Sequence, residues 1–234
     1  MRLLAGHFAL LVWVSLAVSL DAILIRKEAF TDTGSGITKE VIKEYVTEKG
    51  TVTDIEVTAE VRIMGGLKRE ILKVTEIRTR EGDKLVVYRV DHRSRTYVRM
   101  EVPPSIAFPF AFWTSGNLDP TGETGRIGRW TAEKFRVSLP TPGGGGIQVV
   151  WLTKENKDLM EAERRRLRML KGKAGGELVR KVEETLKKYG SPVKTETYLH
   201  GMKRVEVVKE VSRKSIDESR LKPPKDYRRL GAGR

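Results

Sequence analysis

The middle of the chain, residues 39–101, alternates apolar and polar residues in short runs that turn residues separate. Its clearest run is residues 85–102, which alternates up to Val90, breaks at residues 91–95 and resumes at Thr96. A period of two is typical of a strand with one buried face. Because Gly-containing breaks separate consecutive runs, the pattern predicts an antiparallel meander in which each strand pairs with the next.

The alternation also assigns faces within this hairpin. We expect the buried face to carry one set from each strand: Val86, Tyr88 and Val90, then Thr96, Val98, Met100 and Val102. The opposite face would carry Arg89, Tyr97, Arg99 and Glu101. A sheet with one apolar face must bury that face against another layer, which other parts of the chain must supply.

Further strands are predicted on both sides of this hairpin. They are expected at residues 22–30, 52–63, 71–79, 128–139 and 147–153, with two more within 195–216. Residues 41–48 fit a short helix as well as a strand, and the neighbouring strands favour a strand.

Two segments are candidate covers for the sheet. Residues 103–113 are apolar and proline-rich, which excludes a long regular helix but requires burial. Residues 153–189 carry apolar residues at helical spacing, weakly at first and then clearly. The clear stripe is Leu178, Val182, Leu186 and Tyr189. We therefore expect two helices as a helical insertion at about 154–189.

The N-terminus predicts a secretory signal peptide over residues 1–19. Arg2 is followed by an apolar run over residues 8–20, which as a helix is about 20 Å long and too short to span a bilayer comfortably. Small residues at 17 and 19 favour cleavage after Ser19, and cleavage after Ala22 is a second option. The alternative is an uncleaved membrane anchor. We expect a mature protein that is exported, periplasmic and soluble.

Residue types that serve catalysis are scarce. The chain has no cysteine and three histidines, His7, His92 and His200. Asp91 beside His92 could be a base and its orienting partner, but Asp is an ordinary turn former and the turn interpretation is favoured. No Gly-x-Ser-x-Gly motif or metal-ligand spacing occurs. The sequence therefore predicts a non-catalytic protein without metal or cofactor, with an unseen hydrolase as the alternative.

The net charge of +14 is concentrated in residues 154–234, where 24 Lys and Arg face 13 Asp and Glu. An exported protein does not meet nucleic acid, so we expect an anionic membrane surface as the partner. The candidate cations are Arg164, Arg165, Arg166, Arg168, Lys187, Lys188, Arg228 and Arg229. A solvated helix face is the alternative, because one Gln, two Asn and 32% charged residues are typical of thermophile proteins.

Aromatic residues supply the candidate ligand site. They are Phe108, Phe110, Phe112, Trp113, Trp130 and Trp151. One interpretation is a lid and floor for an acyl-like ligand, because apolar side chains line such pockets. The other is that they fill the core between the sheet and its cover.

Four spaced motifs carry a resemblance to a known family. They are the hairpin with Val90-Asp91 and Thr96-Tyr97, the strand 128–135, the Trp-Leu-Thr-Lys end at 151–154, and the closing Ser219-to-Tyr227 motif. The chain resembles exported bacterial domains of unknown function that are built like the outer-membrane lipoprotein carrier (LolA/LolB type). In the second of these motifs, where that pattern often has cysteine or glycine, this chain has Trp130 and Ala132.

The resemblance implies an α+β fold, an incomplete antiparallel β-barrel whose curved meander sheet is covered by helices. It implies a single half-barrel domain over residues 20–230, followed by a basic tail at 231–234. In the lipoprotein carrier the apolar concave face accepts acyl chains. Two hypotheses follow: an envelope protein that binds a hydrophobic ligand or lipoprotein in its concave face, or a structural adaptor with a filled core that binds a protein partner or an anionic surface.

Overall fold

One sheet organises the whole protein. The computed structural model describes residues 18–63, 66–103, 118–139, 145–170 and 176–231, and twelve strands within them form a single sheet. The strands are β1 (Ser19–Asp32), β2 (Gly36–Val46), β3 (Gly50–Ile63), β4 (Gly66–Glu81), β5 (Lys84–Asp91), β6 (Thr96–Glu101), β7 (Asp119–Ile127), β8 (Trp130–Leu139), β9 (Gly146–Thr153), β10 (Ser191–Leu199), β11 (Met202–Asp217) and β12 (Arg228–Arg229).

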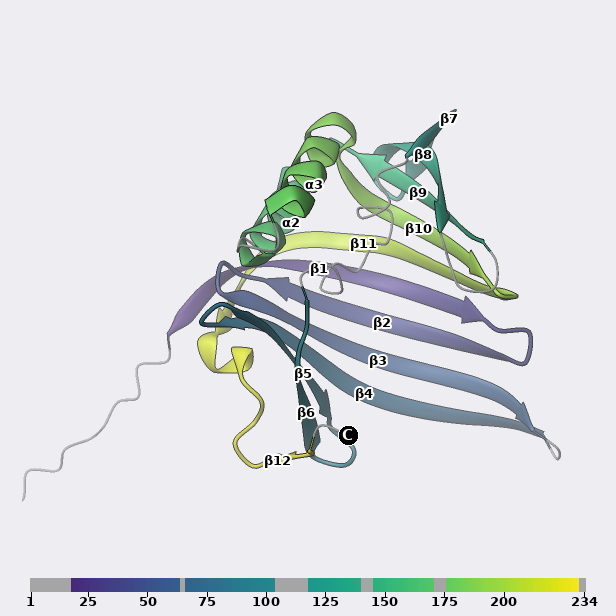
Figure 1. Ribbon diagram of the computed structural model, residues 1–234. Coiled ribbons are helices and arrows are strands. Elements are labelled where there is room, and N and C mark those ends of the chain that lie inside the picture. The colour runs from purple at the N-terminus through teal and green to yellow at the C-terminus, as the bar shows by residue number, and fades with distance from the viewer. Residues whose placement is uncertain (1–17, 64–65, 104–117, 140–144, 171–175, 232–234) are drawn as a thin grey trace, which may run out of the picture.

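The strand order is β12-β6-β5-β4-β3-β2-β1-β11-β10-β9-β8-β7. Strands β1 to β6 form a meander, and β11 returns the chain to the middle by pairing with β1. All neighbours are antiparallel except the two-residue β12, which runs parallel to β6. The two edges do not meet, so the sheet is curved and open (Figure 1).

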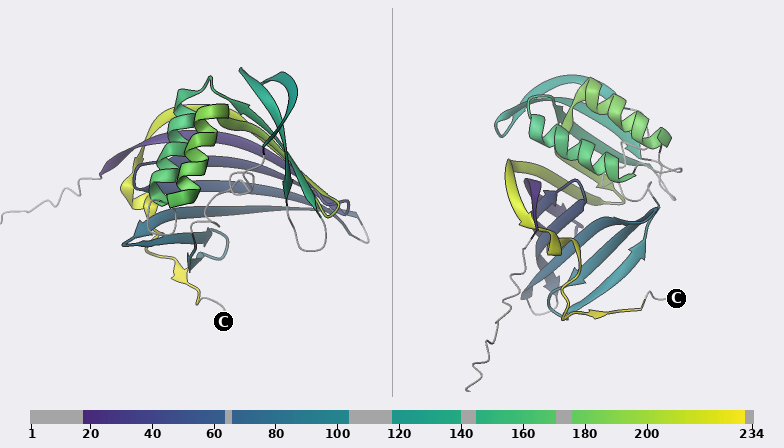
Figure 2. Two further views of the ribbon diagram at one scale, coloured as in Figure 1. Left: turned by 45° about the horizontal axis from the view of Figure 1, so that its top comes forward. Right: turned by 90° about the vertical axis from the view of Figure 1, so that its left-hand side faces the viewer.

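Two helices cover the concave face. They are α2 (Lys157–Leu170) and α3 (Gly176–Tyr189), inserted between β9 and β10. Leu85 of β5 and Phe135 of β8 lie near opposite ends of the strand order, yet both pack in one buried cluster with Val182 of α3. Both arms of the sheet therefore curve toward the helices (Figure 2).

Helix α2 is held to the sheet by a buried network of five charged side chains: Lys27, Glu44, Glu163, Arg166 and Glu206. The Arg166 Nη2 atom lies 2.7 Å from Oε2 of Glu44, and the Arg166 guanidinium also pairs with Glu163. The Lys27 Nζ atom lies 3.3 Å from Oε2 of Glu44 and 3.1 Å from Oε1 of Glu206. The network thus joins α2 to β1, β2 and β11.

The network shifts the acid–base equilibria of its members. Burial alone would raise the pKa of Glu44, but Arg166 and Lys27 lower it to about 2. Burial also opposes ionisation of Glu206, and Lys27 with Arg204 nevertheless lowers the pKa of that carboxyl. Desolvation would lower the pKa of Lys27, but the carboxylates of Glu206 and Glu44 outweigh it and raise that pKa.

The C-terminal segment covers the opposite, outer face of the sheet. A short 3₁₀ helix, η1 (Glu218–Leu221), places Leu221 in a buried cluster with Ala22, Val52 and Ile216. Gly50 permits this approach, since a Cβ there would lie 2.6 Å from the Arg78 carbonyl oxygen and 3.0 Å from Leu221 Cδ2. The chain then crosses to β6, where β12 pairs.

The sequence predicted most of this sheet correctly. The expected strands are present, residues 36–46 form a strand, and residues 153–189 contain both helices. Strand β7 was not predicted, because Asp119–Ile127 carries little apolar character and is mostly exposed. The expected cover at 103–113 lies almost entirely outside the described residues.

The predicted pairing within the 85–102 hairpin was wrong by one residue. Asp91 pairs with Thr96, so the loop has four residues and Arg95 takes a left-handed φ of 52°. A one-residue change of register exchanges the faces of a strand. Val90 therefore lies opposite Tyr97, and Val86 opposite Glu101, on the outer face.

We predict that Glu44→Gln lowers the free energy of unfolding by about 3–5 kcal/mol at pH 7, because it leaves buried cations without a carboxylate. The folded-state pKa of Glu44 is about 2, below its ordinary 4.5. Its contribution is therefore complete above pH 4.5 and is lost as the pH falls toward 2. Chemical denaturation from pH 7 to pH 2 should show a shallower acid loss in the variant than in the natural protein.

The matched control for this test is Glu28→Gln, which removes an exposed carboxylate paired with Lys209. Its stability and pH dependence should match the natural protein. Equal effects of the two substitutions would contradict the role of the network.

We also predict that a chain starting at Leu20 is more stable than one starting at Ile23. The shorter chain lacks Asp21, whose Oδ2 atom lies 2.6 Å from Nη2 of Arg165, and the fully buried Ala22. A loss of about 2 kcal/mol or more corresponds to a melting temperature lower by roughly 4–8 °C. Scanning calorimetry of both chains measures the difference, and equal melting temperatures would refute it.

Candidate functional site

Two of the six predicted aromatic ligand residues lie within the described residues, and both pack in the core. Trp130 is 4% exposed and lies in the cluster that contains Ile23 and Leu159. Trp151 is half-buried against that cluster, with the Nζ atoms of Lys134 and Lys194 at 5.6 and 5.9 Å from its ring centroid. Phe108, Phe110, Phe112 and Trp113 lie outside the described residues.

Under α2 the described residues pack closely around Leu159, Lys27 and Glu163. They leave a cavity of about 10 Å³ there, enough for one water molecule at most. A larger ligand does not fit in that cavity.

Away from the helices, the concave face carries a strip of apolar side chains from three adjacent strands. Register places them together on this face: Ile42, Ile55, Val57, Ala59, Leu72 and Val74, here called the concave strip. Ile42 is buried, whereas Ile55, Val57, Ala59 and Val74 are half-buried and Leu72 is 37% exposed. Helices α2 and α3 lie over the other end of these strands (Figure 1).

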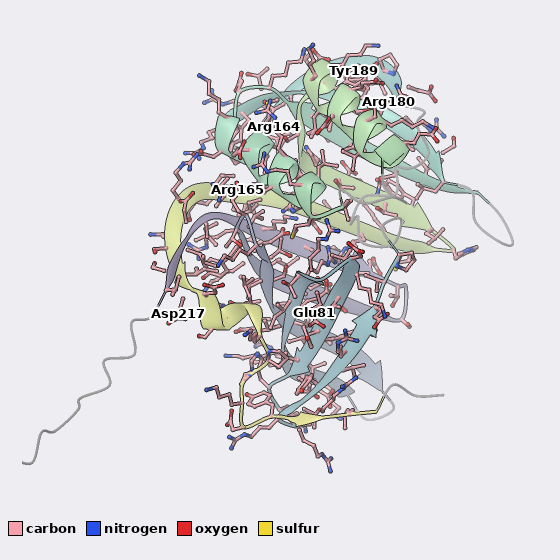
Figure 3. The ribbon with its side chains drawn as sticks, turned by 60° about the vertical axis from the view of Figure 1, so that its left-hand side comes forward. Glu81, Arg164, Arg165, Arg180, Tyr189 and Asp217 are labelled. Carbon is pink, nitrogen blue, oxygen red and sulfur yellow. The ribbon has the colours of Figure 1, made fainter. Side chains whose placement is uncertain are left out.

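The predicted basic surface needs correction at two residues. Arg165 and Arg166 are only 6% and 5% exposed, because they point into the sheet and pair with carboxylates there. Arg164 lies on the outer side of α2, and Arg165 lies where α2 meets the sheet (Figure 3). Buried, paired guanidinium groups do not bind a membrane.

The other predicted cations are accessible but do not form one patch. Arg168 pairs with Glu48 and Glu161, while Lys187 and Lys188 are exposed on α3. Arg228 and Arg229 are exposed on β12, at an edge of the sheet far from α3 (Figure 1).

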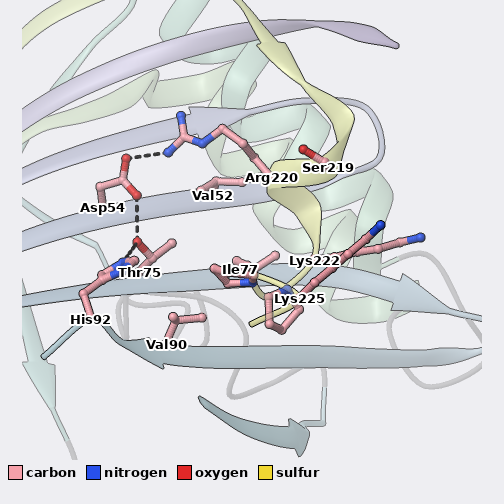
Figure 4. A pocket seen from close by; sticks show the side chains of 12 residues that line it. Val52, Asp54, Thr75, Ile77, Val90, His92, Ser219, Arg220, Lys222 and Lys225 are labelled. Carbon is pink, nitrogen blue, oxygen red and sulfur yellow. Dashed lines mark hydrogen bonds and ion pairs between the residues drawn. The ribbon is translucent and has the colours of Figure 1, made fainter. Parts of the chain in front are cut away.

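The outer face holds a recess that the sequence did not reveal. A cleft of about 560 Å³ lies between strands β3–β5 and the C-terminal segment. Its lining residues are Val52, Asp54, Thr75, Ile77, Val90, His92, Ser219, Arg220, Lys222, Pro223, Pro224 and Lys225, here called the outer cleft (Figure 4). A second recess of about 360 Å³ continues from it and shares Asp54, Thr75 and His92.

A chain of hydrogen bonds crosses the outer cleft. Arg220 donates from Nη2 to Oδ2 of Asp54 at 2.6 Å, and Thr75 donates to Oδ1 of the same carboxylate at 2.9 Å. The Nε2 atom of His92 lies 2.8 Å from Oγ1 of Thr75, and its Nδ1 atom lies 3.0 Å from the hydroxyl of Tyr227. Side chains of β3, β4 and the C-terminal segment are thereby tied together (Figure 4).

The direction of these hydrogen bonds argues against a catalytic triad. A carboxylate only accepts, so the single hydroxyl proton of Thr75 is committed to Asp54. His92 Nε2 must then donate to Thr75, and it cannot take a proton from that hydroxyl. The arrangement fixes the geometry of the outer cleft.

Asp91 and His200 have the turn roles that the sequence favoured. Asp91 accepts hydrogen bonds from Ser94 Oγ at 2.8 Å and from the Arg93 amide at 2.8 Å, which lower the pKa of its carboxyl. His200 is exposed and adopts a φ of 47° between β10 and β11. Asp91 therefore orients the loop and not the His92 ring.

The outer cleft had only a weak signal in the sequence. Its residues come from three strands and from the closing Ser219-to-Tyr227 motif, which the resemblance singled out without giving it a role. Nothing in residue spacing shows that this motif folds back over His92.

Comparison with known proteins assigns no function to this geometry. No protein-family model matches the chain, and no curated protein matches it. Across the described residues, no helix is long and apolar enough to cross a membrane, and no group of three or more His, Asp or Glu side chains is placed to hold a metal ion.

Proposed function

We propose that this protein is a non-catalytic binding protein of the cell envelope that holds a hydrophobic or lipid-like ligand on the concave face of a half-barrel. The concave strip carries this proposal, because its side chains are apolar and only partly covered by the described residues. Burying such side chains against an alkyl chain is favourable by about 0.8 kcal/mol per methylene group. The resemblance to the lipoprotein carrier supports the same face.

The shape of the sheet favours a long ligand. The concave strip takes one side chain from β2, three from β3 and two from β4, and adjacent strands lie about 4.8 Å apart. The strip therefore extends across β2, β3 and β4. The buried cluster of Phe135, Val150 and Leu167 closes the other part of the concave face, so the ligand lies beside the helices.

The basic residues give this binding protein a way to approach its source of ligand. Lys187, Lys188 and Arg164 are exposed on the helical side. Each cation near an anionic lipid surface contributes about 1 kcal/mol. We propose that export takes the mature chain to such a surface in the periplasm.

A pair of neighbouring residues tests the proposal. Leu72 and Ile71 are adjacent on β4 but face the concave and the outer side of the sheet, and both are exposed. We predict that Leu72→Glu weakens uptake of a neutral monoacylglycerol at least tenfold (about 1.4 kcal/mol), whereas Ile71→Glu leaves it unchanged. Native mass spectrometry of the mature protein with added lipid measures the bound fraction.

Native mass spectrometry is also applied to protein purified from its own envelope fraction. Organic extraction of that protein then identifies any bound molecule. A co-purifying acyl-chain species would support the proposal. A clean unliganded mass together with no uptake of monoacylglycerol would contradict it, as would equal losses in the two variants.

A further inference from the structure

We propose that the outer cleft is a second binding site, specific for a small amphiphilic anion with one alkyl chain and a carboxylate or phosphate head. The alkyl chain would lie in the cleft against its proline wall, and the rim would take the head. This site lies on the face of the sheet opposite to the concave strip, so it does not rest on the function proposed above.

The floor of the outer cleft is apolar and well ordered. Val52, Ile77 and Val90 come from three adjacent strands, and register places them side by side on the outer face. Their exposed fractions are 0%, 2% and 0%, so they support the cleft from below and offer a ligand almost no accessible surface of their own. The accessible apolar surface belongs to the opposite wall, which is formed by Pro223, Pro224 and the aliphatic stems of Lys222 and Lys225. The volume of about 560 Å³ is within the usual range of small-molecule sites.

The charges around the cleft favour an anion. Asp54, a carboxylate in the lining, is paired with Arg220 and accepts from Thr75. Lys222 and Lys225 are exposed at the rim, and among the described residues the side chain of neither takes part in an ion pair or hydrogen bond. Two free ammonium groups beside an apolar wall match a ligand with an anionic head and an alkyl body.

The wall that carries these lysines is fixed at both ends. Leu221 anchors it to Val52, and Arg95 pairs with Asp226. The backbone amides of Arg228 and Leu230 donate to the carbonyl groups of Arg95 and Tyr97 at 3.0 and 2.8 Å. The lysines are therefore held over the floor before a ligand arrives, which lowers the entropic cost of binding.

The adjoining recess accommodates the end of a longer chain. It is lined by Val41, Tyr45 and the stems of Lys43 and Lys73, and it meets the outer cleft at Thr75 and His92. Lys73 is paired with Glu56, at 3.3 Å, whereas Lys43 is exposed and adds a further positive charge beside the cleft.

The test is isothermal titration calorimetry of the full mature chain with laurate and with dodecyl phosphate, below their micelle concentrations. We predict binding of both, at least tenfold weaker binding of dodecyltrimethylammonium, and no detectable binding of inorganic phosphate alone. Lys222→Ala combined with Lys225→Ala should weaken laurate at least tenfold and reduce its salt dependence.

The control combines Lys154→Ala with Lys157→Ala, which removes the same charge from exposed sites near the start of α2 and should leave laurate binding unchanged. Melting temperatures verify that both double variants are folded. Laurate should also shift the imidazole NMR signals of His92, assigned with His92→Gln, while those of His200 stay in place.

Equal weakening by both lysine pairs, equal binding of the cationic amphiphile, or the absence of any laurate binding would overturn the proposal. If Leu72→Glu abolishes laurate binding and the Lys222 and Lys225 variant does not, the anion occupies the concave strip. That result would overturn the second site and leave the proposed function standing.

Discussion

The buried charge network between α2 and the sheet is the interaction on which the architecture depends. Lys27, Glu44 and Glu206 project from three adjacent strands, and each would be costly to bury without a partner. Arg166 and Glu163 of α2 complete the set. Because the pairs form only when the helix takes one position along the strands, the network fixes where α2 ends and where the concave strip begins.

That position divides the sheet into parts with different roles. Beneath α2 and α3 the concave face is closed by packed apolar side chains, and beyond them it stays only partly covered. The outer face is covered at one end by the C-terminal segment. Strand β5 is consequently buried on both faces, with Val86 turned outward and Val87 inward. The sheet therefore has a separate cover on each of its two faces.

Much of the fold could be predicted because alternation is a strong local signal. The hairpin register could not, since the four-residue loop 92–95 is set by the left-handed Arg95 and by Asp91 bonding to Ser94. Strand β7 has almost no apolar residues and is held by its pairing with β8.

The sequence of α2 does indicate which of its charged residues are buried. Leu159, Ala162, Leu167 and Leu170 are buried, and Glu163 and Arg166 lie on the same helical face. Their position in the apolar stripe indicates burial, whereas Arg164 and Arg168 fall on the exposed side. The outer cleft had no comparable signal, because it depends on the return of the C-terminal segment over β3–β5.

The central claim is that the two faces of this sheet bind different ligands independently. Native mass spectrometry of the full mature chain with monoacylglycerol and laurate present together tests it most directly. Independent sites predict a ternary complex with one molecule of each ligand, and an unchanged affinity for each in the presence of the other. Mutual displacement, with only binary complexes at saturation, would contradict the claim.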